Sequence, residues 1–80
     1  MMARVTVLYF ASLRDAAGVA QEQIEHEGDL RALYLALQAK HGFALPVDRL
    51  RVASDGAFAH WDDPAHHGAE IAFIPPVSGG

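Results

Sequence analysis

The residues with the clearest chemical potential lie at the end of the sequence. The last segment, PPVSGG, comprises Pro75, Pro76, Val77, Ser78, Gly79 and Gly80. Proline fixes φ and has no amide hydrogen, so two prolines end a strand and leave the chain extended. Glycines at the tip can pass through a tunnel that is too narrow for residues with side chains. From Pro76 to Gly80 the chain can reach roughly 17 Å, at about 3.3–3.6 Å per residue. We therefore predict that residues 75–80 form an extended tail that enters a pocket of another protein.

The reactive group of such a tail is the carboxylate of Gly80. A free carboxylate is a poor electrophile, and an acyl-adenylate made from ATP supplies the leaving group that it lacks. The sequence has neither a GxxxxGK[ST] nor a GxGxxG phosphate-binding pattern. We therefore expect a partner enzyme to use the ATP, and the chain itself to bind no cofactor. Attack by sulfur would leave a thiocarboxylate on Gly80, which is a transferable sulfur.

The other side chains offer little chemistry of their own. The sequence contains no cysteine, which excludes disulfide bonds and thiol nucleophiles. His66 and His67 lie close to Asp62 and Asp63, but no histidine pair has the i, i+4 spacing of a helical metal site. We predict a solvated loop here and no metal. No catalytic triad or carboxylate pair is evident, so we expect the chain not to be an enzyme by itself.

Length and charge limit the class of protein further. Eighty residues are enough for one domain, residues 1–80. The net charge is −4 and the six basic residues are dispersed, which argues against nucleic-acid binding. No apolar run approaches the roughly 20 residues of a membrane span, and the N-terminus lacks the features of a signal peptide. We expect no membrane partner and a cytoplasmic location, which the absence of cysteine fits.

Three segments have the composition of β-strands. Arg4–Phe10 is apolar at nearly every position, which predicts a central strand that is buried on both faces. Glu70–Ile74 is similar and is predicted to be central too. Ala20–His26 is more polar, as expected of an edge strand.

A helix is predicted between Asp29 as N-cap and Gly42 as the residue after its C-terminus. One face of this helix carries Leu30, Leu33, Tyr34, Leu37 and His41.

Two local turns complete the pattern. Ser12 is predicted to cap a single helical turn that ends at Gly18. Asp55-Gly56 predicts a two-residue type I′ hairpin between strands Arg49–Ser54 and Ala57–His60.

The order of these elements is hairpin, helix, hairpin and strand. If the first and last strands are neighbours, the chain must cross over the sheet through the helix, and the two strands run parallel. We therefore predict an α+β fold of the β-grasp (ubiquitin-like) type, with a mixed five-stranded sheet and one main helix on one face.

Two stretches of the sequence resemble a known family, the small subunit of molybdopterin synthase, which is a ubiquitin-like sulfur carrier. VTVLYFASLRDAAG is similar to the family's opening strand and turn, and EIAFIPPVSGG is similar to its ending, Phe-x-Pro-Pro-Val-x-Gly-Gly. The resemblance covers essentially the whole chain. It departs from the family at two turns, where Asp55 replaces a frequent Asn and His67-Gly68-Ala69 replaces Asp-Gly-Asp.

The resemblance implies a mechanism and two partners. Gly80 would be adenylated by an enzyme similar to ubiquitin-activating enzymes, converted to a thiocarboxylate, and inserted into the large synthase subunit. There its sulfur would attack a cyclic pterin precursor and build the dithiolene that binds molybdenum. Phe10, Phe58 and Ile74 match the family's partner-binding face, although the residues themselves leave open whether these side chains lie in the core.

Two alternatives use the same C-terminal chemistry. One is a sulfur carrier for another pathway, such as thiazole synthesis or tRNA thiolation. The other is a ubiquitin-like modifier that is joined to lysines through an amide at Gly80.

Overall fold

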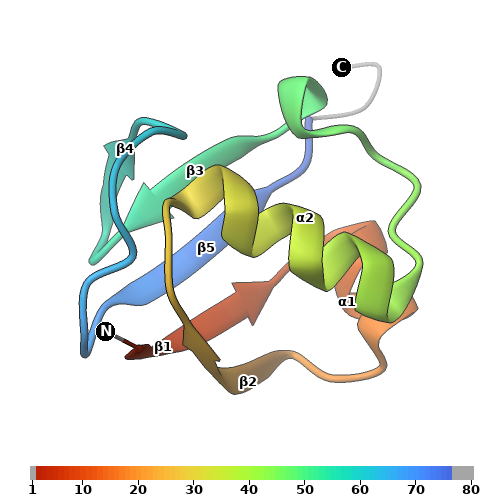
Figure 1. Cartoon of the computed structure of the whole chain (residues 1–80). Coiled ribbons are helices and arrows are strands. Elements are labelled where there is room, and N and C mark those ends of the chain that lie inside the picture. Colours follow the sequence, from red (N-terminus) through yellow and green to blue (C-terminus); the bar gives the residue numbers. More distant parts are fainter. Residues whose placement is uncertain (1, 77–80) are drawn as a thin grey trace.

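The computed structural model describes residues 2–76, which form a mixed five-stranded sheet with a long helix across one face (Figure 1). In chain order, the elements are β1 (Ala3–Tyr9), α1 (Ala11–Ala17), β2 (Gln21–His26), α2 (Leu30–His41), the 3-10 helix η1 (Val47–Arg49), β3 (Arg51–Ser54), β4 (Ala57–Ala59) and β5 (Glu70–Ile74). Pro75 and Pro76 of the predicted tail are described, whereas Val77, Ser78, Gly79 and Gly80 lie outside the described residues.

The strand order in the sheet is β2-β1-β5-β3-β4. The first and last strands of the chain, β1 and β5, are central neighbours and run parallel, with Tyr9 opposite Phe73. The other three pairings are antiparallel, and β2 is an edge strand as predicted. This is the predicted β-grasp arrangement, in which the last strand is held on both sides by neighbours.

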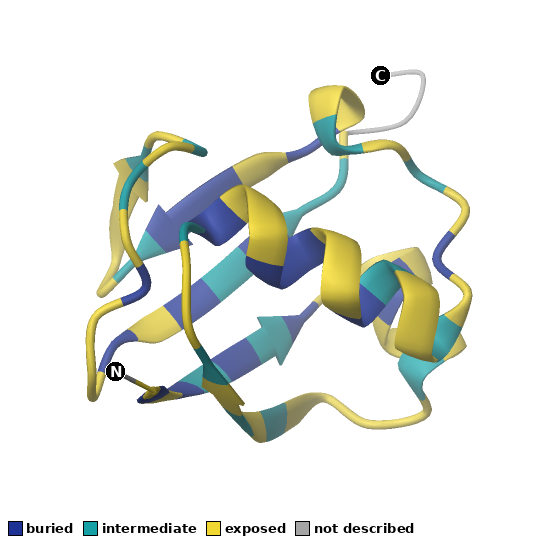
Figure 2. Cartoon of the chain, viewed as in Figure 1, coloured by how far each residue is buried: buried dark blue, intermediate teal, exposed yellow. Residues whose placement is uncertain are grey.

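Strand β1 corrects one prediction about burial. Ala3, Val5, Val7 and Tyr9 are buried, but the residues between them are exposed or half-buried. The prediction of burial on both faces was wrong because α2 packs on one face only, as Figure 2 shows in the alternation of blue and lighter segments. The strand also ends at Tyr9 rather than at Phe10.

Helix α2 follows its sequence signals closely. The Asp29 side chain accepts a hydrogen bond from the Ala32 amide at 2.8 Å, and Gly42 ends the helix with a φ of 74°. Leu30, Leu33, Tyr34 and Leu37 are buried against the sheet and form the centre of the core. His41, predicted on the same face, is only half-buried at the helix end.

The short helix α1 corrects a second prediction. Its N-cap residue is Phe10, which makes no capping hydrogen bond through its side chain, so the prediction of Ser12 as the cap was wrong. Ala11 enters the helix with a φ of 50°, which is uncommon for a residue other than glycine. The predicted end at Gly18 is confirmed.

The hairpin between β3 and β4 is confirmed in position and geometry. Asp55 and Gly56 both have positive φ, 53° and 85°, as a type I′ turn requires. The first strand is shorter than predicted because residues 47–49 form η1. Within residues 2–76, no helix has the length and apolar character needed to cross a membrane.

Candidate functional site

The root of the predicted tail is Ile74-Pro75-Pro76. Ile74 is the last residue of β5 and lies opposite Arg51 of β3. Pro75 is half-buried and Pro76 is exposed. Because β5 is hydrogen-bonded between β1 and β3, the chain leaves the sheet from a central strand whose position is fixed on both sides.

The face of the sheet away from α2 carries an apolar row that runs across four strands. The register places Leu8, Ala72, Ala53 and Phe58 opposite one another in this order. Alternation along the strands directs these side chains away from the face on which Val7 and Phe73 are buried in the core together with residues of α2. With Phe10 and Ile74, they form what we call the apolar sheet face.

The three predicted partner-binding residues all belong to this face, which answers the question that the sequence left open. Phe10 is 46% exposed, Phe58 is 70% exposed and Ile74 is half-buried. None of the three is part of the core cluster. Their role in partner binding remains a prediction, but their side chains are accessible to a partner.

Hollows in the surface surround the tail root. One lies between Phe10, Leu45 and Pro76, and another lies between Phe58, Ala53 and Ile74. Exposed aromatic rings beside shallow hollows are typical of surfaces that bind other proteins. The geometry therefore brings the tail root and the apolar sheet face together at one end of the sheet.

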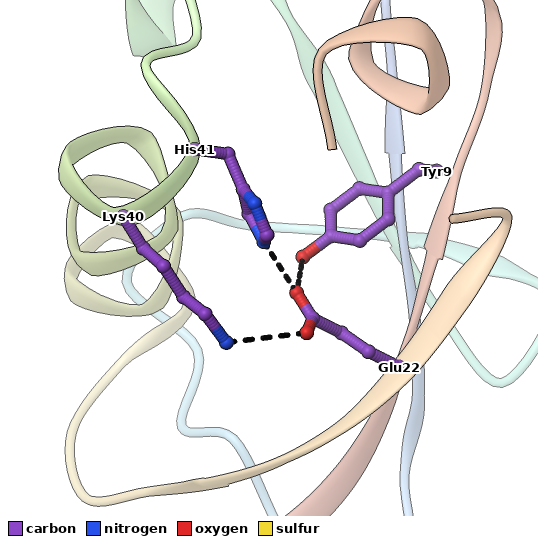
Figure 3. Close-up of polar contacts among 4 residues, drawn as sticks. All are labelled: Tyr9, Glu22, Lys40 and His41. Atoms are coloured by element: carbon purple, nitrogen blue, oxygen red, sulfur yellow. Dashed lines mark hydrogen bonds and ion pairs between the residues drawn. The ribbon is translucent and has the colours of Figure 1, made fainter. Parts of the chain in front are cut away.

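A polar cluster that the sequence analysis missed joins α2 to the sheet (Figure 3). One carboxylate oxygen of Glu22 accepts hydrogen bonds from the Tyr9 hydroxyl at 2.5 Å and from His41 Nε2 at 2.6 Å. The other oxygen accepts from Lys40 Nζ at 3.2 Å. Glu22 thus connects the end of β1 and the C-terminus of α2 to the edge strand β2.

This cluster changes the acid–base properties of its members. Burial alone would raise the pKa of Glu22, but the hydrogen bonds from Tyr9, His41 and Lys40 outweigh it and lower the pKa below the ordinary value of 4.5. Burial, and then the hydrogen bond to Glu22, raises the pKa of the Tyr9 hydroxyl far above its ordinary value. The cluster holds the helix end in place and faces none of the hollows at the tail root. The sequence carried no signal for it, because the four residues come from three separate segments.

Other side chains that could hold a ligand are dispersed. Within the part of the chain that the structure describes, no three His, Asp or Glu side chains are grouped closely enough to hold a metal ion. His66 instead lies 3.3 Å from a carboxylate oxygen of Asp55, and His67 accepts a hydrogen bond from the Arg4 amide.

The fold and the tail root together define a ubiquitin-like protein of the β-grasp type, and comparison with known proteins agrees. The crystal structure of SAMP1 from Haloferax volcanii superposes with a TM-score of 0.80 at 25% identity and covers 98% of this chain and 100% of that chain. The chain belongs to the ThiS family, whose model matches residues 7–80.

Two further relatives bear on function. The molybdopterin synthase sulfur carrier subunit of Haemophilus influenzae is 34% identical and covers 95% of this chain and 99% of its own length. Subunit 1 of the molybdopterin-converting factor of Helicobacter pylori, solved in a complex with subunit 2, is also similar. It has a TM-score of 0.67 and 26% identity, covering 96% of this chain and 99% of that one.

Proposed function

We propose that this protein is the sulfur carrier subunit of a molybdopterin synthase. The observation that carries the proposal is the tail root, because a central strand delivers Ile74, Pro75 and Pro76 beside an exposed apolar face. The sequence then continues to Gly79-Gly80. The name of the Haemophilus relative supports the choice of pathway. In this proposal residues 1–80 are one domain, and residues 75–80 are its tail.

The reactive atom is the carboxyl carbon of Gly80. A partner enzyme joins this carboxylate to the AMP part of ATP and releases pyrophosphate. A sulfur nucleophile then displaces AMP, so that one oxygen of the carboxylate is replaced by sulfur. In the large subunit, this sulfur bonds to a carbon of the cyclic pterin precursor and displaces an oxygen substituent from that carbon, which gives a thioester. Water then hydrolyses the bond between the Gly80 carbonyl and the sulfur, so that the sulfur stays on the precursor and the carboxylate of Gly80 is restored.

The chain itself contributes presentation rather than catalysis. The apolar sheet face, with Phe10, Phe58 and Ile74, is proposed to bind the activating enzyme and the large subunit in turn. The Helicobacter complex of subunits 1 and 2 supports the second of these partners. Because both partners need the same carboxylate of Gly80, their binding must be mutually exclusive.

A protein modifier is the second candidate, and the likeness to SAMP1, a small archaeal modifier protein, favours it. In that case the activated carbonyl of Gly80 would be attacked by a lysine amine of a target protein. The two candidates share the activation step and differ in the nucleophile that follows.

One experiment separates the candidates. The chain is incubated with the activating enzyme of its own organism, ATP and a sulfur source, and its intact mass is measured. Replacement of one oxygen by sulfur, followed by sulfur-dependent formation of molybdopterin when the large subunit and precursor are added, supports the proposal. A thiocarboxylate that yields no molybdopterin would point to another pathway. Adducts with lysines of other proteins, without molybdopterin formation, would favour the modifier.

A further inference from the structure

A hollow of about 350 Å³ beside the tail root differs from the rest of the apolar sheet face, because charged side chains line it together with apolar ones. Phe58, Ile74 and Pro75 form its apolar walls. It lies where β3 meets the last residue of β5, directly beside the point from which the tail departs. The hollow is therefore within reach of a partner that binds the tail at its root.

The charge of this hollow is opposite to that of the whole chain. Arg49, Arg51 and Asp48 are among the residues that line it, and together these three residues carry a charge of +1. The chain as a whole carries −4. Neither arginine forms an ion pair with a carboxylate of residues 2–76, whereas Arg4 and Arg31 each form one.

Arg51 is already oriented. Its guanidinium carbon lies 5.7 Å from the centre of the Phe58 ring, in a cation–π contact on the exposed side of β3 and β4. A guanidinium that lies over an aromatic ring keeps N–H donors for a carboxylate, which it can bind with two parallel hydrogen bonds. Because this cation–π contact restricts the side chain beforehand, less conformational entropy is lost when a partner binds.

We propose that Arg51, which lies over the ring of Phe58, is the specificity-determining contact of this surface. Its occupant is a protein segment that carries an Asp or Glu carboxylate beside an apolar side chain. The inference rests on the proposed function for the existence of a partner that receives the tail, and it adds the chemistry of that partner. Opposite charges at the edge of an interface speed association and reject wrong partners. An acidic segment is repelled by most of this chain and attracted to the hollow at the tail root.

The test is a binding titration between the full chain and the large molybdopterin synthase subunit of the same organism, at low and moderate salt. We expect Arg51→Gln to weaken binding ~10-fold and to reduce its salt dependence. Arg4→Gln is the matched control, because it removes the same charge at the far end of β1, and it should change binding less than about twofold. Arg51→Lys keeps the charge without the planar group, so its affinity should lie between that of the wild type and that of Arg51→Gln.

A charge exchange identifies the carboxylate. Arg51→Glu should bind more weakly than Arg51→Gln, and changing one Asp or Glu of the large subunit to Arg should restore its binding. Circular dichroism spectra and melting curves of every variant show whether the fold is intact. If Arg51→Gln binds within about twofold of the wild type, or loses no more affinity than Arg4→Gln, the inference is overturned.

A negative result for Arg51 can be distinguished from failure of the proposed function. If the wild-type chain does not bind the large subunit at all, the assignment to molybdopterin synthesis fails. The same variants are then measured against the activating enzyme, where the same thresholds decide the role of Arg51. If the wild type binds neither protein, both proposals are rejected.

Discussion

Tyr9 and Phe73 lie opposite each other on the parallel strands β1 and β5, and each is buried and followed by a more accessible apolar residue. Those residues are Phe10 and Ile74. Successive side chains of an extended backbone point to opposite faces, and Phe10 is still extended, with φ −128° and ψ 151°. The packing of Tyr9 and Phe73 in the core therefore directs Phe10 and Ile74 to the apolar sheet face, where Phe10 lies beside the tail root to which Ile74 belongs.

This relationship predicts that Phe73 is essential for stability. Phe73 is fully buried. The centre of its ring lies 5.2 Å from the centre of the Tyr34 ring and 5.9 Å from the centre of the Trp61 ring. Phe73→Ala should lower the free energy of unfolding by about 3–5 kcal/mol. Urea denaturation measures the change. Phe58→Ala is the matched control and should change stability by less than about 1 kcal/mol, and equal losses for the two variants would contradict the assignment of faces.

Phe58 should instead matter for binding. Because its ring is 70% exposed, Phe58→Asp places a charge on the apolar sheet face without burying it. We expect the affinity for the activating enzyme and the large subunit to fall at least ~10-fold, with a melting temperature within a few degrees of the wild type. Unchanged binding to both proteins would show that neither one covers this ring.

The Glu22 cluster predicts a pH dependence of stability. The pKa of Glu22 is lower in the folded than in the unfolded chain, so the unfolded chain binds the proton more readily. The stabilisation is therefore complete above the ordinary pKa of 4.5 and is lost as the pH falls through the lowered value. Glu22→Gln should cost about 1–3 kcal/mol at pH 7.

The measurement compares unfolding of the wild type and Glu22→Gln between pH 7 and pH 3. The difference between them should narrow at the acidic end, since the protonated carboxyl of the wild type then resembles the amide. Glu25→Gln is the control, because Glu25 lies on the same strand with a side chain that is 61% exposed. A difference that stays constant with pH would contradict the role of the Glu22 charge.

Asp55 is predicted to hold the hairpin against the start of β5. Its side chain accepts a hydrogen bond from the Glu70 amide at 2.9 Å, its own amide donates to the Glu70 carbonyl at 2.8 Å, and its φ is 53°. Asp55→Ala should cost about 1–2 kcal/mol, because alanine lacks the acceptor and tolerates positive φ less well. Asp55→Asn keeps both properties and should be almost neutral in thermal unfolding. If Asp55→Ala and Asp55→Asn lower the stability equally, the loss would come from the missing negative charge instead.

The tail itself is tested by Gly79→Leu and by deletion of Gly80. The core cluster of the described residues extends from Ala3 to Phe73, so both changes should leave the melting temperature unchanged. Deletion of Gly80 should abolish thiocarboxylate formation, and Gly79→Leu should block molybdopterin formation by steric exclusion from the partner's tunnel. Full synthase activity of either variant would disprove the proposed role of the tail.

The amino-acid sequence by itself determined the elements whose signals are local. Asp29 and Gly42 mark the ends of α2, and Asp55-Gly56 specifies the hairpin, because caps and turns depend on a few adjacent residues. The apolar character of the first and last strands was enough to place both in the centre of the sheet. The chemistry proposed for Gly80 also needs only the sequence, since it concerns one terminal carboxylate.

Tertiary structure alone decided which apolar side chains are available to a partner. Phe10, Phe58 and Phe73 are the same type of residue, and only the position of α2 on one face of the sheet buries Phe73 and leaves the other two accessible. Because α2 covers only one face of the sheet, β1 is buried on one face, and the prediction that it is buried on both faces was wrong. The contacts of Glu22 with Tyr9, His41 and Lys40 likewise join separate segments. Such contacts depend on strand register and helix placement, which no local sequence pattern encodes.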